Sequence, residues 1–248
     1  MRFNPQVDDL LVIGDATYSI AEHPGAPDIP YGQEGRQAIV YQLVTEIGEK
    51  RALKVFKSRY RLPILVSLAE KIVPFAQLPG LQVCERTVLT ARRHGALLRR
   101  YPELVYAVLM PWVEGPTWTQ VVGEGAELSP ERSLVLSRGL ADILVRMEER
   151  GLAHCDLSGS NVMLPMLAGE EGLQLVDVEQ MYAPGLHRPE ALPGGSPGYA
   201  HKSTFEGVWG RSADRFAGAV LLAEMLAWCD ERIREARWGE SYFAPKEM

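Results

Sequence analysis

The sequence predicts an α+β fold in which a small antiparallel sheet is followed by a mostly helical region. Short runs of β-branched and aromatic residues, separated by glycine and proline, fill the first part of the chain, whereas apolar stripes with helical spacing dominate the second part. The 248 residues are enough for one compact domain with two lobes. The strands expected in the first lobe are residues 17–21, 38–44, 51–56, 82–89 and 104–110.

Helix signals complete this prediction. Apolar residues with helical spacing follow Pro63 and end near Pro74, which predicts one helix inside the sheet region. Ser129 and Pro130 have the residue types of an N-cap and a first helical position, and Gly151 is typical of a helix end, so a long helix should connect them. The elements expected after this helix are strands at 161–164 and 173–178 and an apolar helix at 213–227.

Residues 111–119 are rich in proline and glycine, which is typical of a connection between lobes. We therefore expect a first lobe of residues 1–113 and a second lobe of residues 114–248. The hinge between them is expected at residues 110–116.

Composition excludes several classes of partner. The net charge is −6 and no long basic stripe is present, so neither nucleic acid nor a membrane is expected to bind. No apolar run is long enough to span a bilayer, and the N-terminus has no leader pattern, which together predict a cytoplasmic location. The three cysteines lack the spacing of a disulfide or zinc framework. One basic cluster is interpreted as the solvated side of a helix or turn: Arg92, Arg93, Arg99 and Arg100.

The strongest chemical signal is the run His-Cys-Asp-Leu-Ser-Gly-Ser-Asn at residues 154–161, with Asp177 after the next apolar strand. Phosphoryl transfer requires a carboxylate near the acceptor hydroxyl and oxygen ligands that hold magnesium on the phosphates. Asp156 has the residue type for the first task, and Asn161 and Asp177 have the residue types for the second. The alternative is a polar turn with capped ends, which leaves the aspartate at the strand end unexplained.

Together with the Ala-Leu-Lys-Val run at residues 52–55, this order of motifs resembles the protein kinase superfamily, in the divergent form of bacterial-type, eukaryotic-like serine/threonine protein kinases. The resemblance implies a bilobal kinase-like fold with a shortened helical lobe, and ATP and Mg²⁺ as cofactors in a cleft between the lobes. It also implies that Lys54 holds the α- and β-phosphates and pairs with a carboxylate on the following helix. Glu70 is the expected partner and Glu85 the alternative, while an exposed helix face is the simpler interpretation of Glu70.

A second segment is similar to the glycine-rich loop that covers the phosphates in this family. Gly35 and Ala38 match the second and third glycine positions, and Gly32 lies one place from the first. Glycine allows backbone amides to approach phosphate oxygens closely. A plain hairpin turn is the alternative interpretation of these residues.

Residues 110–115 are similar to the hinge that binds adenine, with Met110 at the gatekeeper position. Adenine requires one carbonyl and one amide from this segment. Pro111 keeps its carbonyl, and Val113 keeps both backbone groups, so the hinge is compatible with nucleotide binding.

Two segments of the second lobe extend the resemblance. Residues 195–199 (Gly-Ser-Pro-Gly-Tyr) resemble the end of a kinase activation segment, on which a peptide substrate lies. Asp214, which precedes an apolar helix, resembles the buried aspartate that accepts hydrogen bonds from the catalytic loop in this family. Its expected role is structural.

Four residues depart from the family pattern. Cys155 replaces an arginine that responds to activation-loop phosphorylation, so we expect no control of that kind. Ser158 replaces a lysine near the transferred phosphate, which predicts slow turnover. Glu179 replaces a glycine and resembles the second carboxylate of aminoglycoside- and choline-type kinases. Ser203 replaces the glutamate that ties the activation segment to an arginine.

The function expected from these motifs is phosphorylation of serine or threonine hydroxyls of a protein substrate by ATP. Asp156 would act as base and orienting group, and Lys54 would bind the phosphates. Two alternatives stay open. Glu179 favours a small-molecule kinase, and Ser158 together with Ala38 favours a pseudokinase that acts as a docking module.

Overall fold

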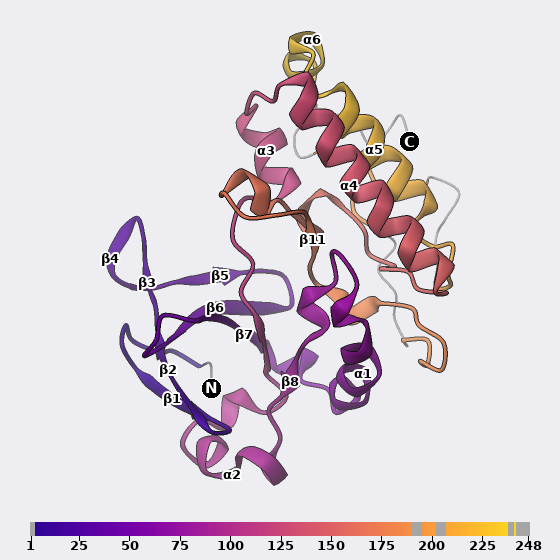
Figure 1. Cartoon of the computed structure of the whole chain (residues 1–248). Helices are drawn as coiled ribbons and strands as arrows, with labels where there is room; N and C mark the ends of the chain where they lie inside the picture. Colours follow the sequence, from indigo (N-terminus) through magenta and orange to yellow (C-terminus); the bar gives the residue numbers. More distant parts are fainter. Residues whose placement is uncertain (1–2, 190–194, 202–206, 238–240, 242–248) are drawn as a thin grey trace. The chain divides into compact units, whose positions relative to one another are not determined.

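The computed structural model describes residues 3–189, 195–201, 207–237 and 241. The chain forms two compact units, each built from two stretches of sequence (Figure 1). Unit 1 consists of Met1–Phe75 and Val83–Trp112, and unit 2 consists of Ala76–Gln82 and Val113–Met248. The chain therefore changes unit between Trp112 and Val113, inside the segment expected to be the hinge. The stretch Ala76–Gln82 belongs to unit 2 although its sequence neighbours belong to unit 1.

Unit 1 is built on an antiparallel sheet of seven strands, which curls in Figure 1. The strand order is β1-β2-β6-β7-β9-β8, and β5 also pairs with β6. These strands are β1 (Leu10–Ile13), β2 (Ala16–Ile20), β5 (Gly32–Glu34), β6 (Ala38–Thr45), β7 (Lys50–Phe56), β8 (Thr87–Val88) and β9 (Val108–Pro111). Because β2 and β5 pair with successive parts of β6, the hairpin of β3 (Glu22–His23) and β4 (Ala26–Pro30) is an insertion between them.

The apolar core of unit 1 lies against one face of this sheet. Successive side chains of a strand point to opposite faces, and the core takes alternate residues of the two central strands. In β6 these are Ile39 and Tyr41, and in β7 they are Leu53 and Val55, all of them buried. The other face of the same strands is therefore the one available for polar chemistry.

Helix α2 (Ala91–Arg100) was not predicted from the sequence. Its Leu97 and Leu98 are buried in the core of unit 1, whereas its four arginines are exposed. The basic cluster is thus the solvated side of a helix, as expected. The backbone of His94 is non-helical, which interrupts the spacing by which a helix is recognised in a sequence.

Two of the expected strands are largely wrong. Residues 82–89 contain a 3₁₀ turn (Gln82–Cys84) before the two-residue strand β8, and Arg86 Nε donates to the carbonyl of Val83. In the range 104–110, Leu104 ends a 3₁₀ turn that begins at Pro102, and the strand β9 starts only at Val108. Proline fixes φ and has no amide donor, and therefore favours a turn over a paired strand at this point.

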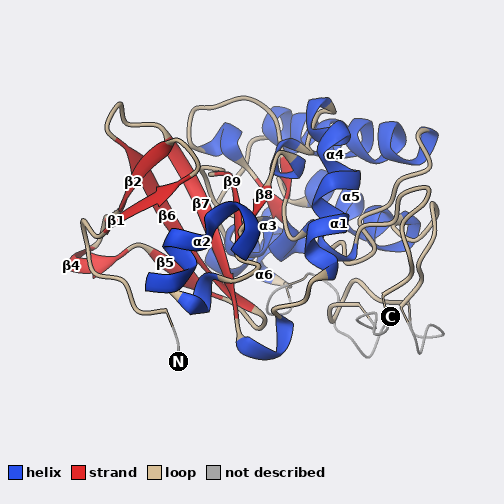
Figure 2. Ribbon diagram, turned by 90° about the horizontal axis from the view of Figure 1, so that it is seen from below, coloured by secondary structure: helices blue, strands red, loops and turns tan. Residues whose placement is uncertain are grey.

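The helices predicted from proline and serine signals are confirmed. Helix α1 (Ile64–Ile72) follows Pro63 and buries Leu65, Leu68 and Ile72. In unit 2, α4 (Pro130–Glu149) begins after Ser129, whose hydroxyl accepts a hydrogen bond from the amide of Arg132. Both helices are drawn in blue in Figure 2.

Unit 2 is mostly helical. Its remaining elements are α3 (Trp118–Glu124), α5 (Arg215–Ala227), α6 (Glu231–Glu235) and a small sheet of β10 (Val162–Met163) and β11 (Gln174–Leu175). Helices α4 and α5 pack side by side, and a Cβ at Gly218 would lie 2.7 Å from a methyl group of Leu144. Within the described residues, no helix is long and apolar enough to cross a membrane.

Helix α3 was not predicted from the sequence, and its first two residues lie in the expected linker, residues 111–119. Thr117 and Gln120 form a capping box, in which each side chain accepts a hydrogen bond from the backbone of the other. Gly125 ends the helix in the left-handed conformation. These local signals were hidden by the proline and glycine content of residues 111–119.

The stretch Ala76–Gln82 is fixed to unit 2 by backbone and side-chain contacts. The amide of Leu175 in β11 donates to the carbonyl of Gly80, and the Gln174 side chain accepts from the amide of Gln82. Leu81 is fully buried. Gly80 has a positive φ of 77° and lies against Ile143 of α4, so a side chain at this position would be strained and would collide.

Candidate functional site

Strand register in unit 1 brings several of the predicted nucleotide-binding residues to one face of the sheet. Lys54 in β7 lies opposite Val108 of β9, and two residues earlier Ala52 lies opposite Met110. Residues that are directly opposite share a face, as do residues two apart in one strand. Lys54 and Met110 are therefore on the same face, which is opposite to the face that carries the apolar core.

Ala38 joins this group from the neighbouring strand. It begins β6 opposite Phe56, which is two residues after Lys54. Ala38, Lys54 and Met110 are all buried. The Lys54 ammonium lies 5.3 Å from the centre of the Phe56 ring, a distance at which a cation is attracted to an aromatic face.

Two residues of this face were not assigned as site residues from the sequence. Val40 lies opposite Lys54, and Ala52 lies between Gln42 and Met110 in adjacent strands. Both follow from the two-residue period of a strand, because Val40 is two places from Ala38 and Ala52 is two places from Lys54. They would form the apolar surface around Lys54.

The expected pairing of Glu70 with Lys54 stays a prediction. Glu70 is exposed, on the side of α1 away from the buried Leu65 and Leu68. The alternative residue, Glu85, forms an ion pair of 2.9 Å with Arg51.

The glycine-rich segment forms a tight hairpin between β5 and β6. The amide of Gly35 donates to the carbonyl of Ala38 at 2.8 Å. Gly32 lies opposite Tyr41 on the core side of the sheet, and a Cβ at Gly32 would come 2.9 Å from the Tyr41 ring. Packing thus accounts for Gly32, while phosphate binding by this hairpin stays a prediction.

The predicted hinge residues lie on both sides of the unit boundary. Met110 and Pro111 end β9 in unit 1, where Pro111 lies opposite Arg51, and Val113 is the first residue of unit 2 after the boundary. The Met110 sulfur is 3.6 Å from a guanidinium nitrogen of Arg86, which fixes its side chain. Adenine binding by these three residues stays a prediction.

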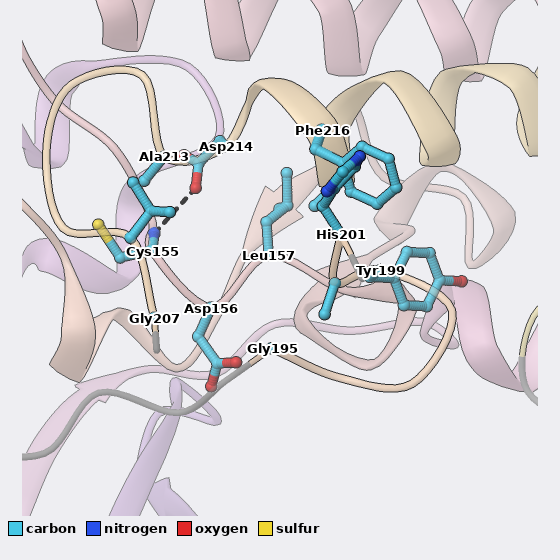
Figure 3. A pocket seen from close by; sticks show the side chains of 13 residues that line it. Cys155, Asp156, Leu157, Gly195, Tyr199, His201, Gly207, Ala213, Asp214 and Phe216 are labelled. Carbon is cyan, nitrogen blue, oxygen red and sulfur yellow. Dashed lines mark hydrogen bonds between the residues drawn. The ribbon is translucent and has the colours of Figure 1, made fainter. Parts of the chain in front are cut away.

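In unit 2 a buried aspartate holds the backbone just before Asp156. The Asp214 carboxylate accepts hydrogen bonds from the amides of His154 and Cys155, the latter at 2.8 Å (Figure 3). Burial raises the pKa of Asp214, because a buried carboxylate loses its hydration. The structural role expected for Asp214 is confirmed.

A chain of hydrogen bonds brings together Asp156, Asn161 and the residue before Asp177. The Asn161 side-chain amide donates to the carbonyl of Asp156 at 2.7 Å, and the carbonyl of Asn161 accepts from the amide of Val176 at 3.0 Å. The His154 ring donates from Nε2 to the carbonyl of Val176 at 2.6 Å. Asp177 follows directly. The loop at 154–161 and the segment that carries Asp177 are therefore held in one fixed arrangement.

Asn161 and Asp177 carry oxygen atoms of the kind that Mg²⁺ prefers, and metal binding by these residues stays a prediction. Because the Asn161 nitrogen donates within the loop, its Oδ1 is the atom left to face a cation. Asp177 is exposed and has the left-handed backbone conformation, with φ of 62°. Mg²⁺ usually takes one or two protein ligands and completes its shell with water and phosphate oxygens. The described residues contain no group of three or more His, Cys, Asp and Glu side chains placed to hold a metal.

Asp156 is one of the residues that line a pocket of about 80 Å³ in unit 2 (Figure 3). Its walls are mainly apolar and include Leu157, Tyr199 and Phe216. Figure 3 shows the Asp156 carboxylate pointing away from Asp214. Asp156 and Asp214 are the two carboxylates that line this pocket, and the catalytic role of Asp156 stays a prediction.

The neighbouring cysteine is unsuited to act as a nucleophile. Burial, with the nearby charge of Asp214, raises the pKa of Cys155 to about 12. The thiol is therefore protonated at neutral pH, and the thiolate is the reactive form. Among groups that line this pocket, Asp156 rather than Cys155 has the chemistry of a base.

Two of the departures from the kinase pattern have a structural outcome. Ser158, which stands where kinases have a lysine, is buried. Its hydroxyl lies 3.0 Å from the hydroxyl of Ser160, so its side chain points into the loop. Glu179 lies in the 3₁₀ turn Val178–Gln180 that follows Asp177. Ser203 lies outside the described residues.

Comparison with known proteins identifies the fold. Scans of protein-family models and of curated proteins found no match. Among solved structures, the crystal structure of the kinase domain of PF14_0431 matches with a TM-score of 0.60 and 13% sequence identity, over 90% of this chain and 67% of that one. The kinase-like α+β fold predicted from the motifs is confirmed. At this identity the likeness concerns the fold alone.

Proposed function

We propose that this chain is an ATP- and Mg²⁺-dependent phosphotransferase, most simply a eukaryotic-like protein kinase that phosphorylates serine or threonine. The observation that carries this proposal is the hydrogen-bonded arrangement of Asp156, Asn161 and the Asp177 segment in unit 2. Phosphoryl transfer depends on positioning and charge neutralisation, and a fixed set of two carboxylates and one amide oxygen supplies both. ATP supplies the phosphoryl group, and Mg²⁺ neutralises its developing charge.

In this proposal, the position of each site residue in the fold determines its role in phosphoryl transfer. Asp156, in the pocket of unit 2, accepts the proton of the acceptor hydroxyl and orients it. Asn161 Oδ1 and the Asp177 carboxylate hold the metal. Lys54, buried on the face of the unit 1 sheet that is opposite to the apolar core, binds phosphate oxygens, because an ammonium donates charge-assisted hydrogen bonds to them.

The test is transfer of label from ATP in the presence of magnesium to a generic protein acceptor and to a panel of aminoglycosides and choline. Asp156→Asn and Lys54→Ala are compared with Asp142→Asn, which changes an exposed carboxylate of α4. We expect transfer to protein, lowered about 10²- to 10⁴-fold by Asp156→Asn and unchanged by Asp142→Asn. Full activity of a folded Asp156→Asn variant would contradict the proposed base.

A second candidate is a pseudokinase that docks a partner, and Ser158 favours it. Its burial leaves the loop without the cation that kinases place near the transferred phosphate. The same assay separates the candidates. ATP binding without transfer to any acceptor supports the pseudokinase, and fast transfer to a metabolite alone supports the small-molecule kinase.

A further inference from the structure

A second pocket, of about 250 Å³, lies in unit 1 on the side of the sheet that carries the apolar core. It is lined by Ile39 and Val55, which are directly opposite each other in β6 and β7. Phe3 also lines it and is fixed in place by edge-to-face contacts with the rings of Tyr41 and Tyr101. These three lining residues are buried, so the pocket is a space beside the core that the side chains of the protein leave unfilled.

The other lining residues come from the chain that leaves β7, and they bring two cations to the pocket: Phe56, Lys57, Ser58 and Arg61. Arg61 Nε donates to the carbonyl of Phe56 at 2.9 Å, which fixes the guanidinium while its terminal nitrogens carry the remaining donors. The Lys57 ammonium forms an ion pair of 2.9 Å with Glu34, so part of its charge is already compensated. Arg61 is therefore the group best suited to bind an anion at this pocket.

The size and the lining of the pocket together define a class of ligand. An apolar cavity of about 150 Å³ binds benzene, so a pocket of about 250 Å³ can hold roughly ten carbon atoms. An apolar body in this space would supply van der Waals contacts that the lining side chains lack. A guanidinium favours a carboxylate as the anion, because the two groups can form two parallel hydrogen bonds.

We infer that this pocket binds a carboxylate with an apolar body of roughly eight to ten carbon atoms, such as a medium-chain fatty acid, with the charged group at Arg61. The inference goes beyond the proposed function. Val55 is next to Lys54 in β7, and successive side chains of a strand point to opposite faces of the sheet. The pocket and the predicted nucleotide-binding residues therefore lie on opposite faces, and binding of the carboxylate does not depend on phosphoryl transfer.

The probe for this inference is octanoate. It is compared with 1-octanol and octylammonium, which have the same chain without a charge and with the opposite charge. The methyl signals of Ile39 and Val55 in NMR spectra of the full-length protein are followed through each titration. We expect octanoate to shift both signals saturably and to bind more tightly than octanol, and octylammonium to leave them unchanged. The absence of a saturable shift with octanoate, or equal binding of octylammonium, would overturn the inference.

Substitution of the cation tests how the charged group is bound. Arg61→Gln should weaken octanoate binding by about 10-fold or more and leave octanol binding unchanged, and Arg61→Lys should recover part of the loss. Arg59→Gln is the matched control, because Arg59 is a neighbouring exposed cation whose guanidinium lies over the Tyr60 ring. Equal losses in Arg59→Gln and Arg61→Gln would mean that octanoate responds to net charge alone, which would overturn the inference.

A third substitution tests the apolar part of the pocket. Val55→Leu adds a methylene group to the lining, so we expect weaker binding of both octanoate and octanol, measured at the Ile39 methyl signals. Octanoate should also raise the unfolding midpoint of the wild type more than that of Val55→Leu or Arg61→Gln, because a ligand that binds the folded state stabilises it. The same rise in all three proteins would place octanoate at another site and overturn the inference.

Discussion

The two units place their candidate site residues by different means. In unit 1, Lys54 and Met110 are placed by strand register, which is maintained by backbone hydrogen bonds along whole strands. In unit 2, the loop around Asp156 has no regular structure apart from one 3₁₀ turn and is held by a few polar side chains, above all Asp214. Many backbone hydrogen bonds therefore fix the position of Lys54 and Met110 in unit 1. In unit 2, single side chains such as Asp214 fix the position of the loop around Asp156.

We expect the largest loss of stability when Asp214 is replaced, because this one carboxylate holds the loop around Asp156. Asp214→Ala removes the acceptor of two backbone amides and leaves both buried without a partner, so we expect a loss of about 3 kcal/mol in unfolding free energy. Urea unfolding followed by circular dichroism measures it. Asp142→Ala, at an exposed carboxylate of α4, should change the value by less than about 0.5 kcal/mol. Equal values for the two variants would show that Asp214 does not hold the loop.

An intermediate effect is expected for a packing change in unit 1. Gly32→Ala places a Cβ against the Tyr41 ring, and we expect a loss of about 1–3 kcal/mol from overpacking. Gly35→Ala is the matched control, because its Cβ would lie 3.6 Å from the nearest atom, an ordinary contact. Thermal or urea unfolding of the two variants tests the comparison. A loss that is larger for Gly35→Ala would contradict the register of β5 on β6.

We expect the smallest change in stability from the titration of His94 in unit 1. Burial lowers the pKa of His94 in α2, and its Nδ1 accepts a hydrogen bond from the amide of Thr90 at 3.2 Å, which requires the neutral ring. The unfolded chain takes up this proton at about pH 6.5, before the folded chain does. Stability from His94 is therefore complete above this pH and declines as the pH falls toward the lower folded pKa.

Unfolding midpoints at about pH 7.5 and about pH 5.5 measure this decline. His94→Asn keeps an acceptor for the Thr90 amide but cannot titrate, so we expect it to lose less stability between the two pH values than the wild type. The same loss in both proteins would mean that His94 is not the titrating group.

The sequence predicted features that depend on local pattern. The strands around Lys54 were recognised by their short β-rich runs, α4 by Ser129 and Pro130, and the Asp156 loop by its spacing to Asn161. Which side of α1 packs depends on tertiary contacts, so the sequence left two interpretations of Glu70 open, and the exposed one matches the structure. Helix α3 was missed although its end signals are local, because it begins at the edge of the segment 111–119 that is rich in proline and glycine.

The attachment of Ala76–Gln82 to unit 2 has a consequence for engineering and for folding. Neither half of the protein is a continuous piece of the gene, so a cut between Trp112 and Val113 separates two fragments that are both incomplete. A helical fragment that starts at Val113 lacks Leu81 and the Gly80 carbonyl, and it exposes the apolar site that Leu81 fills. Swapping one half between related proteins therefore requires that seven-residue stretch to be exchanged together with the helices, and a nascent chain cannot complete the helical half before the ribosome has made both stretches.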